Sequence, residues 1–242
     1  MRKLLIAVPV LALLGVPQGF AADLPDKAAL DEAIRSYLLE HPDVIVEALQ
    51  KYEAQREAAR EQAAADALAE RKDDLYNHPM TPVSGNPKGD VTIVEFFDYQ
   101  CGYCKRTMQS VLDLQKEDAN IRFAWKELPI LGPTSQFAAR AAMAAKNQDK
   151  YLEFHTAVMG SRGQLTPDRV MQHAKAIGLD IDRLKTDMMS PEIDKYLRDT
   201  LELAQQLGIN GTPGFVIGGK LVPGALSKEQ MKELVAAARK PS

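Results

Sequence analysis

The feature that most constrains the fold is a run of apolar, β-branched and aromatic residues from Val91 to Phe97. Such a near-continuous run is typical of a strand that other layers of structure cover on both faces. A three-residue turn follows it. Cys101 and Cys104, the two cysteines of the 242-residue chain, come next and lie three positions apart. We expect a helix to begin at this pair and to run to about Asp118.

The downstream pattern predicts an α/β fold in which a helical insertion interrupts a sheet. Further strands are expected at 121–126, 214–218 and 220–222. The insertion spans about 131–207 and contains several helix-start signals. The clearest helix starts pair an N-cap residue with a proline, or carry a capping box, and lie at Thr166, Ser190 and Ser227.

The amino terminus has the pattern of a secretory signal peptide. A basic Met1-Arg2-Lys3 precedes an apolar run of about eleven residues, and small residues precede a cleavage point after Ala21. A membrane-spanning helix needs about 20 apolar residues, which is more than this run provides. We therefore expect residues 1–21 to be removed. Since no ER-retention tetrapeptide ends the chain, a bacterial periplasm is the expected location, where disulfides persist.

Residues 22–80 are expected to form an N-terminal helical oligomerisation segment and a linker. The segment is rich in Ala, Glu, Arg and Lys, which favour helices, and Pro42 divides it into two helices. Each helix carries apolar residues at three- and four-residue steps, including Ile34 and Leu49. This narrow stripe is too small to stabilise the segment alone, so we expect copies of the chain to associate through it.

The two cysteines carry the expected chemistry. Backbone N–H groups at a helix start favour a thiolate, so Cys101 is the expected nucleophile and the shielded Cys104 the resolving thiol. A structural disulfide closing so small a loop would stabilise the chain little. Two thiolates are too few for zinc, although Cu(I) could accept both. The four histidines show no zinc spacing, and we expect no resident metal or other cofactor.

The segment from Phe96 to Arg106, which includes Cys-Gly-Tyr-Cys, resembles the active site of the DsbA family of thioredoxin-fold oxidoreductases. Far downstream, Gly208 to Ile217 resembles the cis-proline loop of that family and its following strand. The resemblance implies a DsbA-like thioredoxin domain over 81–242, with Thr212 and Pro213 binding substrate. The helical segment before it resembles the ScsC (suppressor of copper sensitivity) subgroup, of which some members trimerise.

The resemblance also bears on the direction of the reaction. Gly102 and Tyr103, between the cysteines, differ from the Pro-His of strongly oxidising members and resemble the dipeptide of DsbC-type isomerases, as does Thr212. We therefore expect an isomerase or reductase acting on protein cysteines, kept reduced by a membrane partner of the reductase type, and assembled as a trimer rather than a dimer. A primary oxidase of the DsbA type and a Cu(I)-binding copper-tolerance protein are the alternatives.

Several other side chains have two interpretations. Glu95 matches the acidic position beneath the disulfide of the family, where it would accept a proton from Cys104, but it could also be a paired surface acid. Lys126 either tunes the thiolate or is solvated. Four methionines of the insertion are expected in the core: Met143, Met159, Met188 and Met189. A net charge of −3 gives no electrostatic reason to expect nucleic acid binding.

Overall fold

The computed structural model describes residues 26–240, so the predicted signal peptide lies outside the described residues. The chain divides into two compact units, the first ending at Gln55 and the second beginning at Arg56. No helix between residues 26 and 240 is long and apolar enough to cross a membrane.

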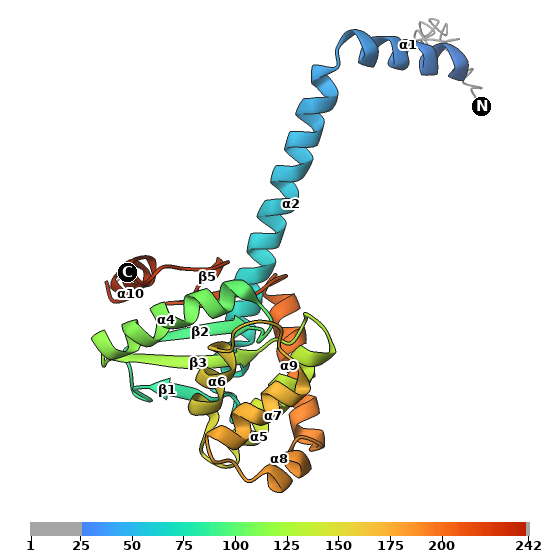
Figure 1. Ribbon diagram of the computed structural model, residues 1–242. Coiled ribbons are helices and arrows are strands. Elements are labelled where there is room, and N and C mark those ends of the chain that lie inside the picture. Colours follow the sequence, from blue (N-terminus) through green and yellow to red (C-terminus); the bar gives the residue numbers. More distant parts are fainter. Residues whose placement is uncertain (1–25, 241–242) are drawn as a thin grey trace, which may run out of the picture. The chain divides into compact units, whose positions relative to one another are not determined.

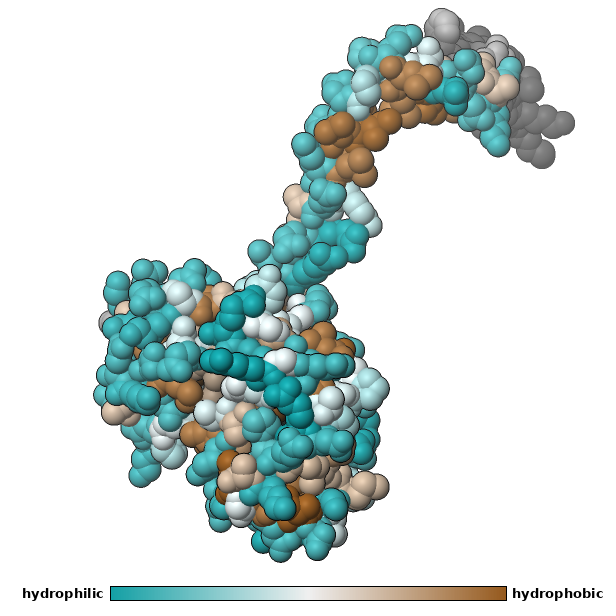
Figure 2. Space-filling model, viewed as in Figure 1, coloured by the Kyte–Doolittle hydropathy of each residue, from teal (hydrophilic) through white to brown (hydrophobic). Residues whose placement is uncertain are grey.

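The first unit contains helix α1 (Lys27–Glu40) and the beginning of helix α2 (Asp43–Glu70). Asp26 caps α1 by accepting a hydrogen bond from the Ala29 amide, and the chain breaks at His41-Pro42 as predicted. The two helices bury no side chain, and large apolar residues are exposed along both. Figure 2 shows these side chains gathered on one face of α1 and of the adjoining part of α2.

A five-stranded sheet forms the centre of the second unit, in the order β1-β3-β2-β4-β5 (Figure 1). The central strands β2 (Val91–Phe97) and β3 (Ile121–Glu127) are parallel. Strand β4 (Gly214–Ile217) pairs antiparallel with β2, and β5 (Lys220–Pro223) pairs antiparallel with β4. Strand β1 (Val83–Gly85) pairs antiparallel with β3. We did not predict β1, because it is short and lies in a stretch rich in Pro and Gly.

Helices cover both faces of the sheet. Successive residues of a strand point to opposite faces. Ile93 and Phe97 pack in one core cluster with α4 (Gly102–Glu117), whereas Val94 and Phe96 pack in a second cluster on the other face. Helix α10 (Lys228–Ala238) begins at the predicted capping box of Ser227.

The insertion contains five helices, which gather to one side of the sheet (Figure 1). They are α5 (Pro133–Lys146), α6 (Tyr151–Met159), α7 (Pro167–Ala176), α8 (Ile181–Asp187) and α9 (Pro191–Gln206). Thr166 and Ser190 cap α7 and α9 as predicted. Met143, Met159 and Met188 are buried, but the expectation for Met189 is wrong, because its side chain is 74% exposed just before α9 begins.

The predicted boundary near residue 80 differs from the division that the structure shows. Helix α3 (Lys72–Tyr76) belongs to the second unit, and Leu75 is completely buried in the cluster beneath Val94 and Phe96. The Arg122 guanidinium also donates to the Tyr76 carbonyl at 2.7 Å. Residues 56–80 are therefore part of the unit that holds the cysteines, and not a linker to it.

Candidate active site

The cysteine pair lies where the structure joins β2 to α4. Cys101 is the N-cap of α4, and its Sγ accepts a hydrogen bond from the Cys104 amide at 3.4 Å. Both cysteines are free thiols. The Cys101 side chain retains 6% exposure, whereas Cys104, one turn into the helix, has none. An attacking group from solution can therefore reach Cys101 but not Cys104.

The loop before β4 lies next to Cys101, because β4 pairs directly with β2. The Thr212–Pro213 peptide bond is cis, as the resemblance implied, and the Cys101 thiol donates to the Thr212 carbonyl oxygen at 3.1 Å. The fold thus brings together residues 111 positions apart. Pro213 is buried and Thr212 is half-buried, so the backbone of Thr212 forms the wall opposite the thiol.

Glu95 lies beneath the cysteines. Its position on β2 gives it the same face as Ile93 and Phe97, which pack in the cluster that contains Cys101 and Cys104. Its side chain is buried, and its Oε2 has no hydrogen-bond partner among the described residues. Burial, with the nearby Cys101, raises the pKa of Glu95 to about 8. The interpretation as a paired surface acid is therefore wrong.

The pKa of Cys104 is raised far above its ordinary value, first by burial and then by Glu95. A buried thiol beside a buried carboxyl holds its proton unless another group accepts it. The carboxyl of Glu95 influences the Cys104 proton, and its Oε2 has no hydrogen-bond partner among the described residues.

Gly102 and Tyr103 occupy the first turn of α4 between the cysteines. Both are exposed, Tyr103 at 60%, and the Arg106 guanidinium lies over the Tyr103 ring at 4.3 Å from its centroid. This cation–π contact holds the ring on the surface beside the thiol pair. The dipeptide thus borders the site without filling it.

The turn that carries Cys101 is anchored by residues that our sequence reasoning missed. Asp98 accepts hydrogen bonds from the Gln100 amide at 2.7 Å, from the Ser135 hydroxyl at 2.7 Å and from the Leu131 amide at 2.9 Å. Gln100 in turn donates to Ser135 and to the Leu131 carbonyl. An Asp that begins a tight turn is a recognisable signal, but its partners in the insertion leave no local pattern.

A second buried polar group joins the sheet to the insertion. Glu127 accepts hydrogen bonds from the hydroxyls of Tyr99 and Tyr151, at 3.2 and 2.8 Å, and Tyr99 also contacts His155 Nδ1 at 3.1 Å. Burial lowers the pKa of His155 to about 3 and raises that of Glu127 well above its ordinary value. These hydrogen bonds join Tyr151 and His155 of α6 to β3 and to the turn before Cys101.

Lys126 contradicts both of its interpretations. Its side chain is 1% exposed, so it is not solvated. It points to the face of the sheet opposite Glu95, where its ammonium donates to the Asp74 carbonyl and to the Thr81 hydroxyl, each at 2.6 Å. It therefore does not contact the cysteine pair. Burial lowers the pKa of Lys126 to about 7.

A cysteine pair that follows a central strand, begins a helix and contacts a cis-proline loop before the neighbouring strand is the architecture of thioredoxin-fold thiol–disulfide oxidoreductases. Residues 92–236 match the DSBA-like thioredoxin domain, and the chain belongs to this family. Residues 26–59 match the N-terminal domain of the copper resistance protein ScsC. These matches confirm the predicted thioredoxin fold with its helical insertion and N-terminal helical segment.

Solved structures are similar over most of the chain. A thioredoxin-like oxidoreductase from Silicibacter pomeroyi DSS-3 is 48% identical, with a TM-score of 0.69, and the match covers 70% of this chain and 98% of that one. The catalytic domain of Proteus mirabilis ScsC is 29% identical, with a TM-score of 0.66, and the match covers 72% of this chain and 97% of that one. BcfH from Salmonella enterica Typhimurium is 26% identical, with a TM-score of 0.72, and the match covers 88% of this chain and 96% of that one.

Curated relatives include much longer proteins. The Na(+)/H(+) antiporter NhaA 1 of Salinispora arenicola is 30% identical over 158 residues, which are 64% of this chain and 24% of that protein. The chain thus spans about a quarter of the length of the first relatives that it matches.

Proposed function

We propose that the chain is a periplasmic thiol–disulfide oxidoreductase that isomerises or reduces disulfides of protein substrates. The observation that carries the proposal is the position of Cys101, which is the reachable thiol, caps a helix and contacts the Thr212 carbonyl. The buried Cys104 lies one turn behind it. This geometry supports a nucleophile and a resolving thiol. The match to a family of thiol–disulfide oxidoreductases supports the same chemistry.

The proposed reaction has two exchange steps. The Cys101 thiolate attacks one sulfur of a substrate disulfide, forming a mixed disulfide and releasing the other substrate sulfur as a thiolate. In reduction, Cys104 loses its proton and attacks Cys101, which releases the second substrate thiolate and leaves a Cys101–Cys104 disulfide. In isomerisation, a substrate thiolate attacks the mixed disulfide instead, so the protein regains its Cys101 thiolate with no net oxidation.

Glu95 is the proposed acceptor of the Cys104 proton. Its pKa of about 8 lies near neutral pH. A side chain transfers protons most effectively when its pKa is close to the pH at which the protein works. Its Oε2 makes no hydrogen bond among the residues from 26 to 240, so it is free to accept one.

The choice of isomerase or reductase over oxidase rests on three features. The Gly102-Tyr103 dipeptide and Thr212 resemble those of DsbC-type isomerases. The exposed apolar stripe of α1 and α2 lies in the part that matches the ScsC N-terminal domain, which supports assembly into an oligomer, with a trimer favoured by the resemblance. An isomerase also requires a reduced thiol pair, so the proposal includes a membrane partner of the reductase type.

Reactivation of ribonuclease with scrambled disulfides tests this function. The mature protein, residues 22–242, should reactivate it, and Cys101→Ser should not. A chain of residues 56–242 should still exchange small disulfides but should lose reactivation. The reduction potential against glutathione provides the opposing test, since a value near that of a strong oxidant, about −120 mV, would favour the primary oxidase instead.

Binding of Cu(I) by the two thiolates is a second candidate, supported by the match of residues 26–59 to a copper resistance protein. Two thiolates suit Cu(I), which accepts low coordination by soft ligands. Between residues 26 and 240, no group of three or more His, Cys, Asp or Glu side chains is placed to hold a metal ion. Anaerobic Cu(I) titration of the reduced protein and of Cys101→Ser separates this function from catalysis, because only copper binding predicts a stoichiometric site that the variant loses.

A further inference from the structure

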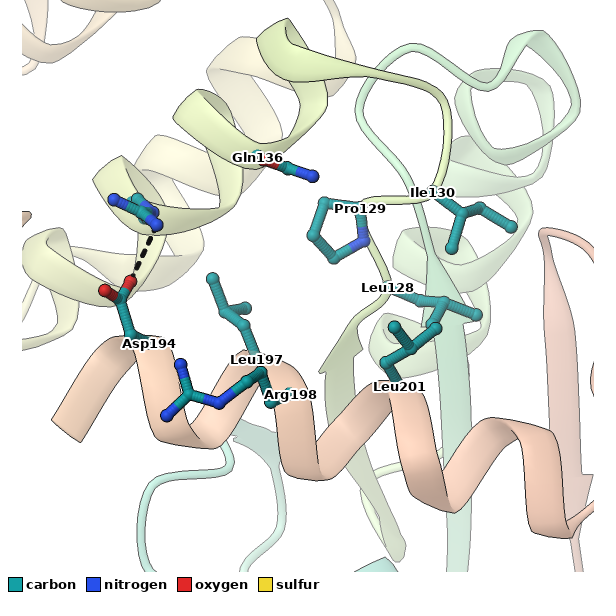
Figure 3. Close-up of a pocket in the computed structure, with 9 residues that line it drawn as sticks. Leu128, Pro129, Ile130, Gln136, Asp194, Leu197, Arg198 and Leu201 are labelled. Atoms are coloured by element: carbon teal, nitrogen blue, oxygen red, sulfur yellow. Dashed lines mark ion pairs between the residues drawn. The ribbon is translucent and has the colours of Figure 1, made fainter. Parts of the chain in front are cut away.

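A second concave site lies between the loop that follows β3 and helix α9 (Figure 3). Its apolar wall consists of Leu128 and Pro129 from the loop and of Leu197 and Leu201 from α9, with a volume of about 180 Å³. Figure 3 shows Leu197 and Leu201 pointing from α9 towards the loop and α5. An apolar cavity of about 150 Å³ is large enough for a benzene ring, so this one has room for one large apolar side chain.

The site is open to solvent rather than sealed. Ile130 and Leu201 at its edge are 39% and 38% exposed, although both are large apolar residues. Exposed apolar side chains around a concave surface are typical of a binding site. The thiol chemistry described above does not use any of these side chains.

Both walls of the site are connected to the turn that carries Cys101. The loop wall continues into Leu131, whose amide donates to Asp98 and whose carbonyl accepts from Gln100. The other wall, α9, leads directly into the loop in which the Thr212 carbonyl contacts the Cys101 thiol. A polypeptide bound at Cys101 would therefore have an apolar pocket between the two segments that flank the thiol.

The charged side chains at the rim of the pocket indicate which charge a bound group should carry. The Arg140 guanidinium contacts Asp194 at 2.9 Å, so these two charges compensate each other. Arg198, which lines the site one residue after Leu197, is exposed and forms no ion pair with any residue of the described chain. The uncompensated charge at this apolar pocket is thus positive, which complements an acidic side chain of a partner.

We propose that this pocket is a substrate subsite, in which an apolar side chain of the polypeptide joined to Cys101 is buried and an adjacent carboxylate pairs with Arg198. The inference rests on the proposed function and adds a preference among substrates. It predicts that disulfides flanked by an apolar–acidic pair react faster with the protein than disulfides flanked by small polar residues.

Short peptides with a central cysteine, each presented as its mixed disulfide with glutathione, test the preference. A Leu-Glu pair is moved along the peptide one position at a time, and a Ser-Gln pair serves as the reference. The Cys101 thiolate attacks the peptide sulfur and releases glutathione, and Cys104 then releases the peptide thiol, so the protein is oxidised as the peptide disulfide is reduced. The readout is the rate for each peptide divided by the rate for glutathione disulfide.

We expect at least one placement of Leu-Glu to raise this ratio about tenfold, as the burial of one leucine would. Arg198→Glu should abolish most of the gain, and a Leu-Lys peptide should restore it in that variant. Leu201→Ser should lower the ratio for the Leu-Glu peptide and for the Leu-Lys peptide, because both bury a leucine in the pocket. Lys185→Glu, a matched charge reversal at an exposed position of α8 outside the pocket, should leave the ratio unchanged.

Other outcomes would overturn the inference. A wild-type ratio that is equal for Leu-Glu and Ser-Gln at every placement removes the subsite while leaving the thiol chemistry intact. A lower oligomer mass of Arg198→Glu with an unchanged ratio would assign the pocket to contact between copies of the chain. A wild-type protein that reacts with none of the disulfides, glutathione disulfide included, would instead refute the proposed function itself, and with it the subsite.

Discussion

At the scale of single residues, burial distinguishes the two cysteines and supports the different roles that we propose for them. Cys101 and Cys104 have the same side chain and are separated by one helical turn, yet only the first reaches solvent. Burial and Glu95 keep the second protonated, because both raise its pKa. A thiol that is protonated and shielded does not compete for substrate, and it becomes reactive only when a mixed disulfide forms beside it.

Alkylation tests this division. Iodoacetamide added to the reduced protein should modify Cys101 and leave Cys104 unmodified until the protein unfolds, because the reagent attacks accessible thiolates. Peptide mapping by mass spectrometry gives the order, and Cys101→Ser is the control, in which the native protein should resist modification. Equal rates at the two cysteines would contradict the assignment of a shielded resolving thiol.

Glu95 should make folding stability depend on pH. Its carboxyl loses its proton near its ordinary pKa of 4.5 when the chain is unfolded, but only near 8 in the folded protein. Between these values the folded state binds the additional proton, so this group lowers the free energy of unfolding by about 1.4 kcal/mol for each unit of rising pH. Glu95→Gln should not show this fall in the free energy of unfolding. Between pH 5 and pH 8, the stability of the reduced variant relative to the reduced wild type should therefore rise with pH.

Urea denaturation at both pH values measures that difference. Glu233→Gln removes an exposed carboxyl of α10 and should give the same pH dependence as the wild type. The variant should also accumulate the mixed disulfide with substrate, since resolution by Cys104 loses its proton acceptor, and general-base catalysis contributes about a hundredfold or more. A parallel pH dependence in Glu95→Gln and the wild type would show that Glu95 is ionised and solvated.

Residue patterns predicted side chains near the cysteines better than those far from them. Glu95, the cysteine pair and the start of α4 all lie at one junction between a strand and a helix. The local sequence alone was therefore enough to predict them. Lys126 follows Trp125 in an apolar strand, and its burial depends on Asp74 and Thr81, which come from an earlier part of the chain. No pattern within β3 could identify these partners.

At the scale of elements, the segment before β2 is the part in which structure and sequence disagree most. Pro and Gly between residues 77 and 90 predicted a linker, yet β1 pairs with β3 there and α3 packs beneath the sheet. Short elements are held by tertiary contacts more than by propensity. By contrast, the long helices of the insertion begin at Thr166 and Ser190 as predicted, because an N-cap is a local interaction.

The position of α3 predicts where the chain can be truncated. A protein that begins at Arg56 should retain the stability of the second unit, whereas one that begins at residue 81 lacks α3 and should lose several kcal/mol. Leu75→Ala in the complete chain should by itself cost about 2–5 kcal/mol, because the side chain is fully buried. Thermal and urea unfolding measure both effects, and Leu39→Ala, at an exposed position of α1, is the control.

At the scale of the whole molecule, the first unit exposes an apolar stripe that a partner would cover. Its helices bury no side chain, yet Leu30, Ile34, Tyr37, Ile45 and Leu49 are about half exposed in water. Ordering a residue costs about 1–2 kcal/mol, and a narrow apolar stripe offsets that cost only when it is covered. Copies of the same segment would provide an apolar surface of matching length, which supports the oligomer that we propose.

Charge placed in the stripe should therefore dissociate the assembly. Light scattering of the mature protein at tens of micromolar should give a multiple of the monomer mass, with a trimer expected. Ile34→Glu combined with Leu49→Glu should give a monomer that loses ribonuclease reactivation but still exchanges glutathione disulfide. Lys51→Glu, on the opposite side of α2, should change neither the mass nor the reactivation. A monomeric wild type would remove the main physical reason for preferring an isomerase, because a single thiol pair with no enclosing partner is also the arrangement that a primary oxidase needs.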